Sequence, residues 1–313
     1  MKQVITCVNL NAAIDRTYYL PAFEAGGVWR VQRILARAGG KGTNVARTLR
    51  RLGVDSRVVG FAGGRNGAAI RAELDREGIG HDLVEVGGES RVCLNIVSSE
   101  NGRSTELLEP GPAVTAAQLA GLRRVLQETA AASALVVFSG SLPQGLPTDT
   151  YRMLIEDVQA AGARAVLDTS GEPLREGLKA RPYLAKPNGD ELDALAGARA
   201  AGVPERWGQL RALQAAGAVQ AVVTLGADGA LAVDADDGPF RVYAPAIRPV
   251  STVGCGDAFT AGIAAALSQG AGMDEALRRA AAAGAANALT ETAGDVDPAA
   301  FTALLAETRA EVL

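Results

Sequence analysis

The chain has 313 residues and a net charge of −4, with 48% hydrophobic and 21% charged residues. This balance is typical of a soluble globular protein, and the acidic total gives no overall attraction to nucleic acid. A single histidine, His81, and three cysteines without paired spacing argue against a Ser-His-Asp triad, a histidine-ligated metal site and a disulfide framework.

Short apolar runs alternate with amphipathic stretches along most of the chain. The runs predicted as strands are 4–10, 56–64, 134–140, 163–171, 183–188 and 221–226. The stretches predicted as helices are 44–53, 66–78, 148–161, one directly after 188, 256–269, 273–289 and 298–311. Apolar strands that do not alternate, separated by helices, indicate a mostly parallel sheet with helices on both faces, hence a doubly wound α/β fold.

Two segments, 16–36 and 90–109, lack helical periodicity. Within the second, Ser90–Ser98 and Thr105–Glu109 read as two strands around the turn Glu100-Asn101-Gly102, and Asn-Gly between such runs favours a hairpin. We predict that the two segments form a small β-sheet lid on a single domain spanning 1–313, since no linker or repeat is visible.

Nothing in the sequence predicts a membrane or secretory segment. The first fifteen residues lack a basic stretch followed by an apolar one, and the alanine-rich region near 260–290 is interrupted by polar residues. With its unpaired cysteines, the protein is expected to be cytoplasmic, with no nucleic-acid and no membrane partner.

The strongest chemical signal is S-T-V-G-C-G-D-A-F-T-A-G-I, from Ser251 to Ile263. Gly254, Cys255 and Gly256 precede Asp257 at the start of a predicted helix, where backbone amides can converge on an anion. A carboxylate beside such amides can accept a proton from an attacking hydroxyl. The alternative is that Asp257 only caps the helix.

A second glycine-rich stretch, A-G-G-K-G-T-N-V-A-R, spans Ala38 to Arg47. Gly39 and Gly40 allow close approach of a ligand, Lys41 supplies a charge, and Asn44 can bind hydroxyl groups. It is not a Walker A loop, because Lys41 is followed by glycine. Taken alone, it reads equally well as a glycine-rich turn that starts a helix.

Together these stretches resemble the two signatures of the ribokinase-like (PfkB) sugar kinases. Further matches follow in the family's order: 10–15, 139–143, 186–191 and 224–230. The resemblance covers nearly the whole chain and implies a ribokinase-like fold and an ATP-dependent, Mg²⁺-requiring kinase. The usual proline of the first of these stretches is Ala12 here.

The resemblance also implies roles for individual residues. Asp257 would be the catalytic base, with the amides of Gly254, Cys255 and Gly256 stabilising the transferred group. The residues implied for the sugar are Asp15, Gly39, Gly40, Asn44 and Ser139. Those implied for the nucleotide are Lys186, Asn188, Thr224, Gly226, Gly229 and Asn287. Asn188 and Glu191 would hold Mg²⁺, although they also fit a helix capping box, and both roles are compatible.

A phosphorylated sugar is the predicted substrate. Arg91 lies where phosphosugar kinases of this family carry a phosphate-binding arginine, and Lys41 and Arg30 would add positive charge. The stretch T-E-L-L-E-P-G-P (105–112) resembles tagatose-6-phosphate kinases and 1-phosphofructokinases, and Cys93 favours the former slightly. The reaction would phosphorylate a primary hydroxyl of a ketohexose phosphate, giving a bisphosphate. Trp29 departs from the asparagine common to both groups.

Other functions remain open at this point. The chain could phosphorylate an unphosphorylated sugar or nucleoside, or it could be an inactive sugar-sensing protein on the same fold. A nicotinamide-dependent oxidoreductase is disfavoured, because the stretch from Asn9 to Asp15 contains no glycine. An exposed β-lid also favours a homodimer formed through it.

Overall fold

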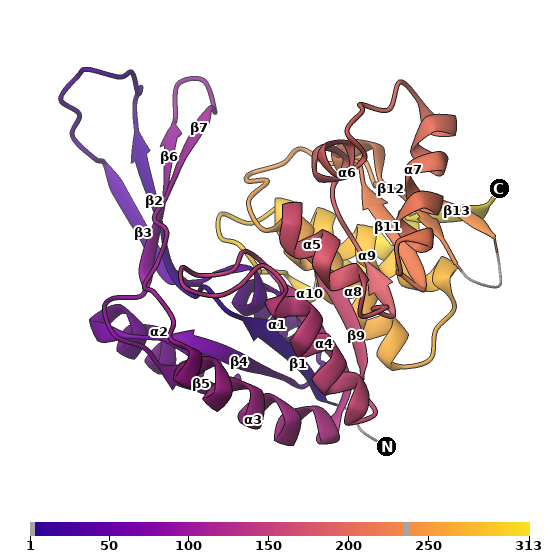
Figure 1. The fold of residues 1–313 in the computed structure, drawn as a ribbon. Helices are drawn as coiled ribbons and strands as arrows, with labels where there is room; N and C mark the ends of the chain where they lie inside the picture. Colours follow the sequence, from indigo (N-terminus) through magenta and orange to yellow (C-terminus); the bar gives the residue numbers. More distant parts are fainter. Residues whose placement is uncertain (1–3, 235–237) are drawn as a thin grey trace.

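Ten strands form the central sheet of the computed structural model, which describes residues 4–234 and 238–313 (Figure 1). Their order is β14-β13-β12-β11-β10-β9-β8-β1-β4-β5. Their bounds are β1 Val4–Asn9, β4 Ser56–Ala62, β5 Gly80–Glu85, β8 Ser133–Ser139, β9 Arg164–Asp168, β10 Leu184–Ala185, β11 Gln220–Thr224, β12 Ala230–Val233, β13 Pro239–Tyr243 and β14 Arg309–Val312. The strands from β11 to β5 pair in parallel, and β12 to β14 extend one edge antiparallel. The predicted mostly parallel sheet is therefore confirmed.

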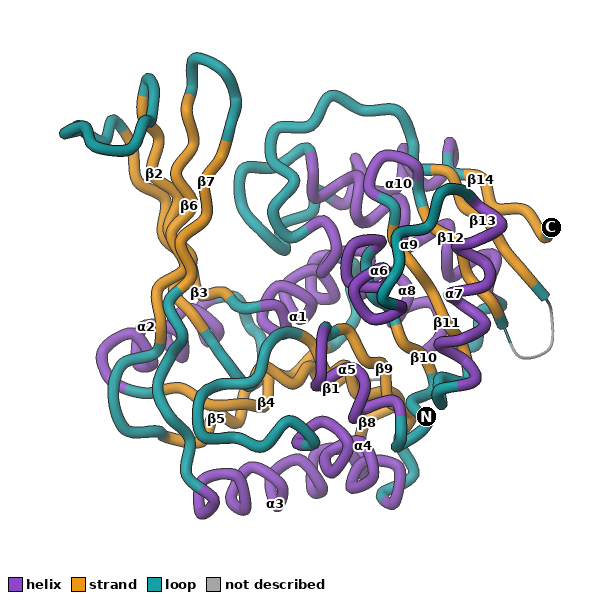
Figure 2. Tube along the Cα trace, turned by 45° about the horizontal axis from the view of Figure 1, so that its top comes forward, coloured by secondary structure: helices purple, strands orange, loops and turns teal. Residues whose placement is uncertain are grey.

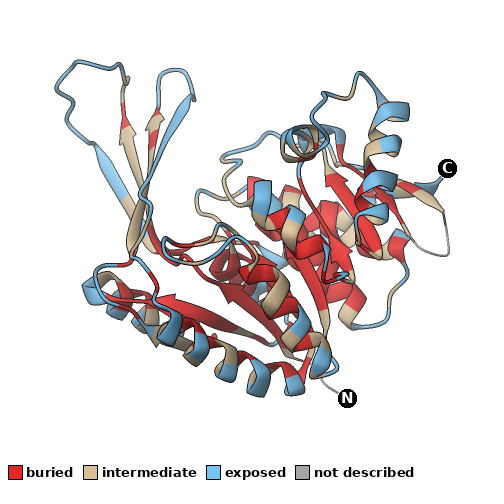
Figure 3. Cartoon of the chain, viewed as in Figure 1, coloured by how far each residue is buried: buried red, intermediate tan, exposed pale blue. Residues whose placement is uncertain are grey.

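Helices cover both faces of this sheet, and no helix in the described residues is long and apolar enough to cross a membrane. Their bounds are α1 Lys41–Arg51, α2 Gly64–Arg76, α3 Ala116–Ala132, α4 Thr150–Ala160, α5 Gly171–Leu178, α6 Gly189–Ala196, α7 Val203–Ala215, α8 Cys255–Ser268, α9 Met273–Ala288 and α10 Pro298–Glu307. Figure 3 shows the sheet buried between them, with exposed residues on their outer sides.

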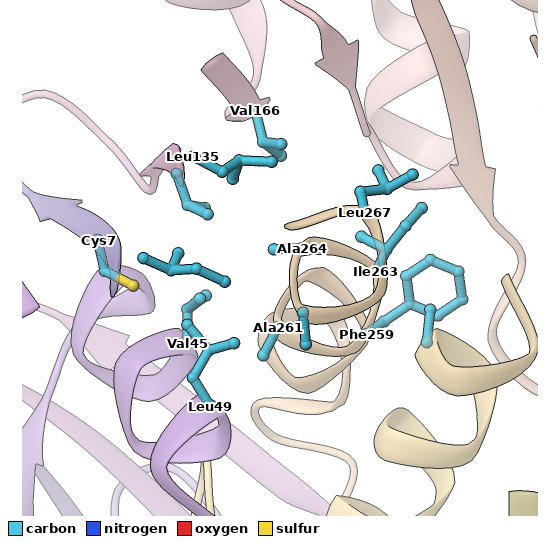
Figure 4. Close-up of a cluster of buried hydrophobic side chains, with 14 of the residues drawn as sticks. Cys7, Val45, Leu49, Leu135, Val166, Phe259, Ala261, Ile263, Ala264 and Leu267 are labelled. Carbon is cyan, nitrogen blue, oxygen red and sulfur yellow. The ribbon is translucent and has the colours of Figure 1, made fainter. Parts of the chain in front are cut away.

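The core consists mainly of one apolar layer on each side of the large sheet, with a third, smaller cluster where α8, α9 and α10 meet. Along β1, Ile5 and Cys7 pack into the layer that contains α1, α8 and α9, whereas Val8 packs into the layer that contains α3 and α4. Figure 4 shows side chains of β1, β8 and β9 meeting those of α1 and α8. This double burial explains why the strands read as continuous apolar runs.

A second, four-stranded sheet projects from the carboxyl-end side of the large one (Figures 1 and 2). Its strands, in the order β3-β2-β6-β7, are β2 Ala13–Leu20, β3 Arg33–Gly39, β6 Arg91–Ser98 and β7 Ser104–Leu108. The predicted hairpin is β6 and β7, which pair antiparallel. The small separate sheet is thus confirmed, while its action as a lid stays a prediction.

The structure contains two helices that the sequence-based assignment lacked, α3 and α7, and it shortens the strand predicted over 183–188 to Leu184–Ala185. Two other predicted elements end early. The helix predicted over 298–311 ends at Glu307, where Thr308 turns to an extended conformation and its hydroxyl bonds to the Leu304 carbonyl. The chain then pairs with the open edge of β13 as β14. The strand predicted over 163–171 ends at Asp168, and α5 begins at Gly171. At the first of these ends the open edge of β13, which local pattern does not reveal, provides the partner for the new strand.

Candidate active site

A cleft of about 460 Å³ opens at the carboxyl ends of the parallel strands. β1 and β8 are neighbours, but the chain continues from them toward opposite edges of the sheet, and such a switch point leaves a crevice. Residues at or just after the ends of β1, β8, β9 and β10 line the cleft: Asn11, Ser141, Asp168 and Lys186.

Most of the predicted site residues meet in this cleft. Those that line it are Asp15, Gly40, Lys41, Asn44, Arg91, Lys186, Asn188, Glu191, Thr224, Gly254, Gly256 and Asp257. Those that do not line it are Arg30, Gly39, Cys255, Ser139, Gly226, Gly229 and Asn287. The folding of the chain brings together residues that lie up to 242 positions apart, from Asp15 to Asp257.

One face of the small sheet forms a wall of the cleft. Side chains alternate between the two faces of a strand, so residues paired across strands share a face. Asp15 lies opposite Arg37 on β3 and Cys93 on β6, and these three residues line the cleft. A substrate bound against the large sheet would therefore contact both sheets.

Asp257 lies in the first turn of α8 and is only 6% exposed. Burial raises its pKa to about 7, although Lys41 and Lys186 favour the charged form. The Asn44 amide donates a hydrogen bond of 2.9 Å to Asp257 Oδ2, while the charge of Asp168 further raises the pKa. A carboxyl group with this pKa is divided between its two protonation states near neutrality, which suits a general base.

The glycines before Asp257 shape the start of α8. Gly254 has φ +82°, and a Cβ there would lie 2.6 Å from that of Ala293, so only glycine fits. A Cβ on Gly256 would meet no atom within 4 Å, which leaves the backbone open to the cleft. The Cys255 amide donates to the Thr252 carbonyl at 3.3 Å, so it already has an acceptor. The helix end, with its partial positive charge, remains available to an anion.

Asn287 stabilises the turn that precedes α8 through hydrogen bonds from the protein interior. It is 1% exposed, and its amide nitrogen donates to the carbonyl of Val253 (2.9 Å) and to Cys255 Sγ (3.5 Å). Its oxygen accepts from the amide of Gly294 at 2.8 Å. The Cys255 thiol therefore points away from the cleft, and burial raises its pKa.

Two lysines and a buried aspartate form the charged floor of the cleft. Lys186 Nζ lies 3.2 Å from Asp168 Oδ2, and Lys41 Nζ lies 3.7 Å from Asp168 Oδ1 and 3.8 Å from Glu191. Burial alone would raise the pKa of Asp168, but the two lysines and a hydrogen bond from Thr260 hold it below its ordinary value. The pKa of Lys41 is raised, mainly by Asp168.

The side of the cleft next to the small sheet is built on a close contact between β2 and β3. A Cβ on Gly39 would lie 2.0 Å from an oxygen of Asp15, so glycine is required there. Gly40 has φ +91° and stacks against Asn9, whose amide donates to Thr43 Oγ1 at 2.8 Å. Burial raises the pKa of Asp15, and nearby arginines and the Gly40 amide oppose this rise.

Arg91 is the best placed of the predicted phosphate ligands. Its Nε and Nη1 donate to the carbonyls of Asn11 (3.1 Å) and Glu109 (3.2 Å), and within the described residues it has no carboxylate at ion-pair distance. Arg30, by contrast, lies in an exposed loop outside the cleft. Ser139 is buried behind the cleft with no hydrogen-bond partner for its hydroxyl in the described structure.

Asn188 and Glu191 form a reciprocal capping box at the start of α6. The Asn188 side chain accepts from the Glu191 amide, and the Glu191 carboxylate accepts from the Asn188 amide, both at 2.8 Å. Thr224 lies beside Asn188 through an isolated parallel bridge. Gly226 and Gly229 shape the next turn, where a Cβ on Gly229 would lie 2.0 Å from the Val242 carbonyl.

The donors at this end of the cleft fit Mg²⁺ only with help from other oxygens. Within residues 4–234 and 238–313 no three His, Cys, Asp or Glu side chains form a metal cage. One Glu191 oxygen is used by the capping box, and the other faces Lys41 at 3.8 Å. Such a sparse oxygen set suits Mg²⁺, which usually keeps several waters and binds through substrate phosphates.

Sequence reasoning missed Asp168, Arg47 and Asn11, which all line the cleft. Asp168 lies inside the run predicted as a strand (163–171), and a charge that interrupts an apolar run was the signal that could have found it. Asn11 lies inside a stretch already compared with the family. Arg47 is the last residue of the glycine-rich stretch Ala38–Arg47, but that stretch does not reveal its burial or its ion pairs with Glu73 and Glu77.

Comparison with known proteins places this geometry among sugar kinases. The model of the pfkB family of carbohydrate kinases matches residues 6–300. The chain is 38% identical to a 1-phosphofructokinase of Xanthomonas campestris, over 85% of this chain and 84% of that protein. It is 34% identical to a 1-phosphofructokinase of Borreliella burgdorferi, over 91% and 92%. The crystal structure of phosphofructokinase-2 from Escherichia coli in complex with potassium superposes with a TM-score of 0.92 at 28% identity, covering 98% of this chain and 99% of that one.

Proposed function

We propose that this chain, which belongs to the pfkB family of carbohydrate kinases, transfers the γ-phosphoryl group of ATP to a primary hydroxyl of a ketohexose phosphate. Its family and its curated relatives make it an ATP-dependent carbohydrate kinase. The single observation that carries the assignment of the site is Asp257, a buried carboxylate with a pKa of about 7 at the start of α8, facing a cleft that contains two lysines.

In the proposed reaction Asp257 accepts the hydroxyl proton as the sugar oxygen attacks the γ-phosphorus. A new P–O bond forms to the sugar, the bond between the γ-phosphorus and the bridging oxygen breaks, and ADP leaves with that bond's electron pair. The backbone at Gly254 and Gly256 and the start of α8 stabilise the migrating group. The amide of Cys255 would have to exchange its Thr252 acceptor for the phosphoryl oxygens.

Lys186 and Lys41 are proposed to contact the phosphates of ATP. Both ammonium groups lie against Asp168, which holds them at the floor of the cleft. The sequence predicted that Lys41 binds the phosphate of the sugar; because its ammonium lies between Asp168 and Glu191, we propose the ATP phosphates as its ligand instead. Positioned cations of this kind supply much of the rate enhancement in phosphoryl transfer.

Asn188 and Glu191 are the residues proposed to hold Mg²⁺ together with the nucleotide. The ion would neutralise charge on the phosphates. The capping box supports the same role, since it fixes both side chains at the start of α6. Thr224, next to Asn188, is proposed to contact the nucleotide, while Gly226, Gly229 and Asn287 act by shaping the turns around it.

The existing phosphate of the sugar is assigned to Arg91. Its guanidinium is held in place by two carbonyls, and its charge is not neutralised by a carboxylate of the described structure. Asp15 and Asn44 would bind sugar hydroxyls on opposite sides of the glycine pair. The small sheet would close over the sugar and exclude water, which otherwise competes for the phosphoryl group.

Fructose 1-phosphate is the first substrate to test, because three curated relatives are 1-phosphofructokinases. Cys93 lines the cleft beside Asp15. Because a cysteine at this position resembles the tagatose-6-phosphate kinases, tagatose 6-phosphate is the second candidate. An ATP-coupled assay would compare fructose 1-phosphate, tagatose 6-phosphate, fructose 6-phosphate and the unphosphorylated sugars. Turnover of free sugars equal to that of the phosphates would refute the assignment of Arg91, and no ATP consumption with any of them would refute the kinase proposal.

A homodimer through the small sheet is the assembly we propose. The face turned away from the cleft carries Ile34 and Leu107, 57% and 54% exposed, and the adjoining loop exposes Val28. A second copy would cover these side chains and the edge of β7. One related structure is described as the tetrameric inhibited form of phosphofructokinase-2 from E. coli, so association occurs in a relative. Sedimentation of wild type and of Ile34→Lys tests this.

The three thiols are free and the site needs none of them oxidised. We therefore keep the expectation of a reducing, cytoplasmic setting. Activity that is unchanged by thiol reductants in the assay buffer would agree with it, and a requirement for an oxidised form would contradict it.

A further inference from the structure

Arg47 is a buried arginine in the lining of the cleft. It lies on α1 and is 2% exposed, so its charge must be fully partnered. Its Nε donates to both oxygens of Glu77 at 2.9 Å, and its Nη2 donates to the carbonyl of Ala38 at 2.7 Å. Glu73 contributes a second carboxylate at 3.5 Å from Nη2. These contacts fix the guanidinium in one place.

The remaining nitrogen of Arg47, Nη1, is shared between Asn44 and the carbonyl of Ala293, which accepts from it at 3.3 Å. Nη1 lies 3.3 Å from Asn44 Oδ1, and Asn44 Nδ2 in turn lies 2.9 Å from Asp257 Oδ2. A guanidinium can only donate hydrogen bonds, and an ionised carboxylate can only accept them. An amide between the two satisfies both only when its oxygen faces Arg47 and its NH₂ faces Asp257. The chemistry at both ends therefore determines the orientation of Asn44.

We propose that Arg47 is a positioning residue for the catalytic base, acting through Asn44. This inference rests on the proposed function, in which Asp257 accepts the proton of the sugar hydroxyl. Arg47 holds the Asn44 amide in the one orientation that directs its NH₂ at Asp257. The same guanidinium donates to the carbonyl of Ala38, directly before Gly39 and Gly40. It therefore connects the backbone of the proposed sugar site to the catalytic base.

The other charged groups that face Asp257 are independent of Arg47. They are Lys41 from α1, Asp168 from β9 and Lys186 from the segment after β10. A variant at position 47 leaves all three in place. The hydrogen bond from Asn44 favours the charged form of Asp257, so its loss removes one contribution that lowers the pKa of the base.

The test is a double-mutant cycle of Arg47→Gln and Asn44→Ala, with kcat and kcat/KM measured against pH. We expect Arg47→Gln to move the acid limb of the profile up by about one pH unit, which lowers the ionised fraction of Asp257, and with it kcat at pH 7, about fivefold. In the Asn44→Ala background, the same change should cost less than about twofold, because the connection is already lost. Equal costs in both backgrounds, or an unmoved acid limb, would show that Arg47 is merely structural.

Two further variants keep the test decisive. Arg50→Gln changes an exposed arginine of the same helix, whose partner is the exposed Asp55, and it should leave kcat and the acid limb unchanged. If Arg47→Gln does not fold, Arg47→Lys replaces it. A lysine keeps the charge but is a point donor that cannot serve Glu77, Ala38 and Asn44 together, so the same shift is expected.

A direct titration separates this inference from the proposed function. Protein labelled with ¹³C at aspartate carboxyl groups, with Asp257 assigned through Asp257→Asn, reports the pKa of the base without any substrate. A wild type inactive on every sugar phosphate would refute the function, and the titration would still compare wild type with Arg47→Gln. An identical Asp257 titration in both proteins would overturn the inference even where the kinase activity is established.

Discussion

Replacing Asp257 with asparagine should separate catalysis from stability. Asparagine has nearly the same shape and can still accept the hydrogen bond from Asn44, but it cannot take up a proton. Loss of a general base typically costs 10²–10⁴ in rate, or about 3–5 kcal/mol of barrier. We expect kcat to fall by that factor while the KM for the sugar changes less than about threefold.

The same substitution should stabilise the protein at alkaline pH. Burial raises the pKa of Asp257 from its ordinary value of 3.8 to about 7, so the folded state holds this proton more tightly than the unfolded state. Stability from this group is present below the unfolded pKa and is lost as pH rises through about 7. A shift of about 3 units at about 1.4 kcal/mol each corresponds to roughly 4 kcal/mol at most.

The measurement is urea unfolding of both proteins at pH 5 and pH 8, with a coupled kinase assay on the same samples. Asp257→Asn should gain free energy of unfolding relative to wild type at pH 8, and the difference should shrink at pH 5. Asp157→Asn, which loses the pair between Asp157 on α4 and the partly exposed Arg123 on α3, serves as a control that should change stability by less than about 1 kcal/mol. Near-normal turnover, or a variant less stable than wild type at pH 8, would refute the reasoning.

Four further outcomes are expected. Arg91→Ala should raise the KM for the sugar phosphate at least tenfold more than the KM for ATP, and equal effects on both would count against a phosphate contact. In wild type, kcat/KM should increase with pH through about 7 as Asp257 ionises, and a flat profile from pH 5.5 to 8 would contradict its role. Asp168→Asn should lower the free energy of unfolding by about 3–5 kcal/mol at pH 7.5, because Lys41 and Lys186 lose their buried partner; a change as small as that of Asp157→Asn would contradict the buried cluster. Glu191→Gln should keep the capping box and the unfolding free energy but raise the Mg²⁺ concentration for half-maximal rate about tenfold, whereas an unchanged Mg²⁺ requirement would exclude Glu191 from the metal site.

The sequence predicted the fold class because the signal is local and repeated. A strand buried on both faces must be apolar throughout, so β1, β4 and β8 could be recognised without knowing their neighbours. The same holds for the hairpin of β6 and β7, which a turn of Asn and Gly marks. β14 could not be predicted, because four residues after a helix become a strand only where the edge of β13 is available.

In the candidate site, too, some features could be predicted from local sequence and others depended on the fold. Gly39 and Gly254 stood out in the sequence because a backbone that approaches another group closely requires glycine, and the structure supplies those groups as Asp15 and Ala293. Lys41 was visible as a charge, but its neighbours Asp168 and Glu191 were not, so its assignment changed. The pKa of Asp257 likewise depends on burial, which residue spacing does not reveal.

By itself, the sequence determined the type of chemistry: a glycine-flanked aspartate at a helix start and a run of motifs in a fixed order, each readable within about ten residues. Only the tertiary structure decided which charges meet. Asp168, Lys186 and Lys41 come from three separate elements, and Arg47 reaches Asp257 only through Asn44. Local pattern encodes the backbone, whereas the electrostatic field at the base depends on distances across the fold.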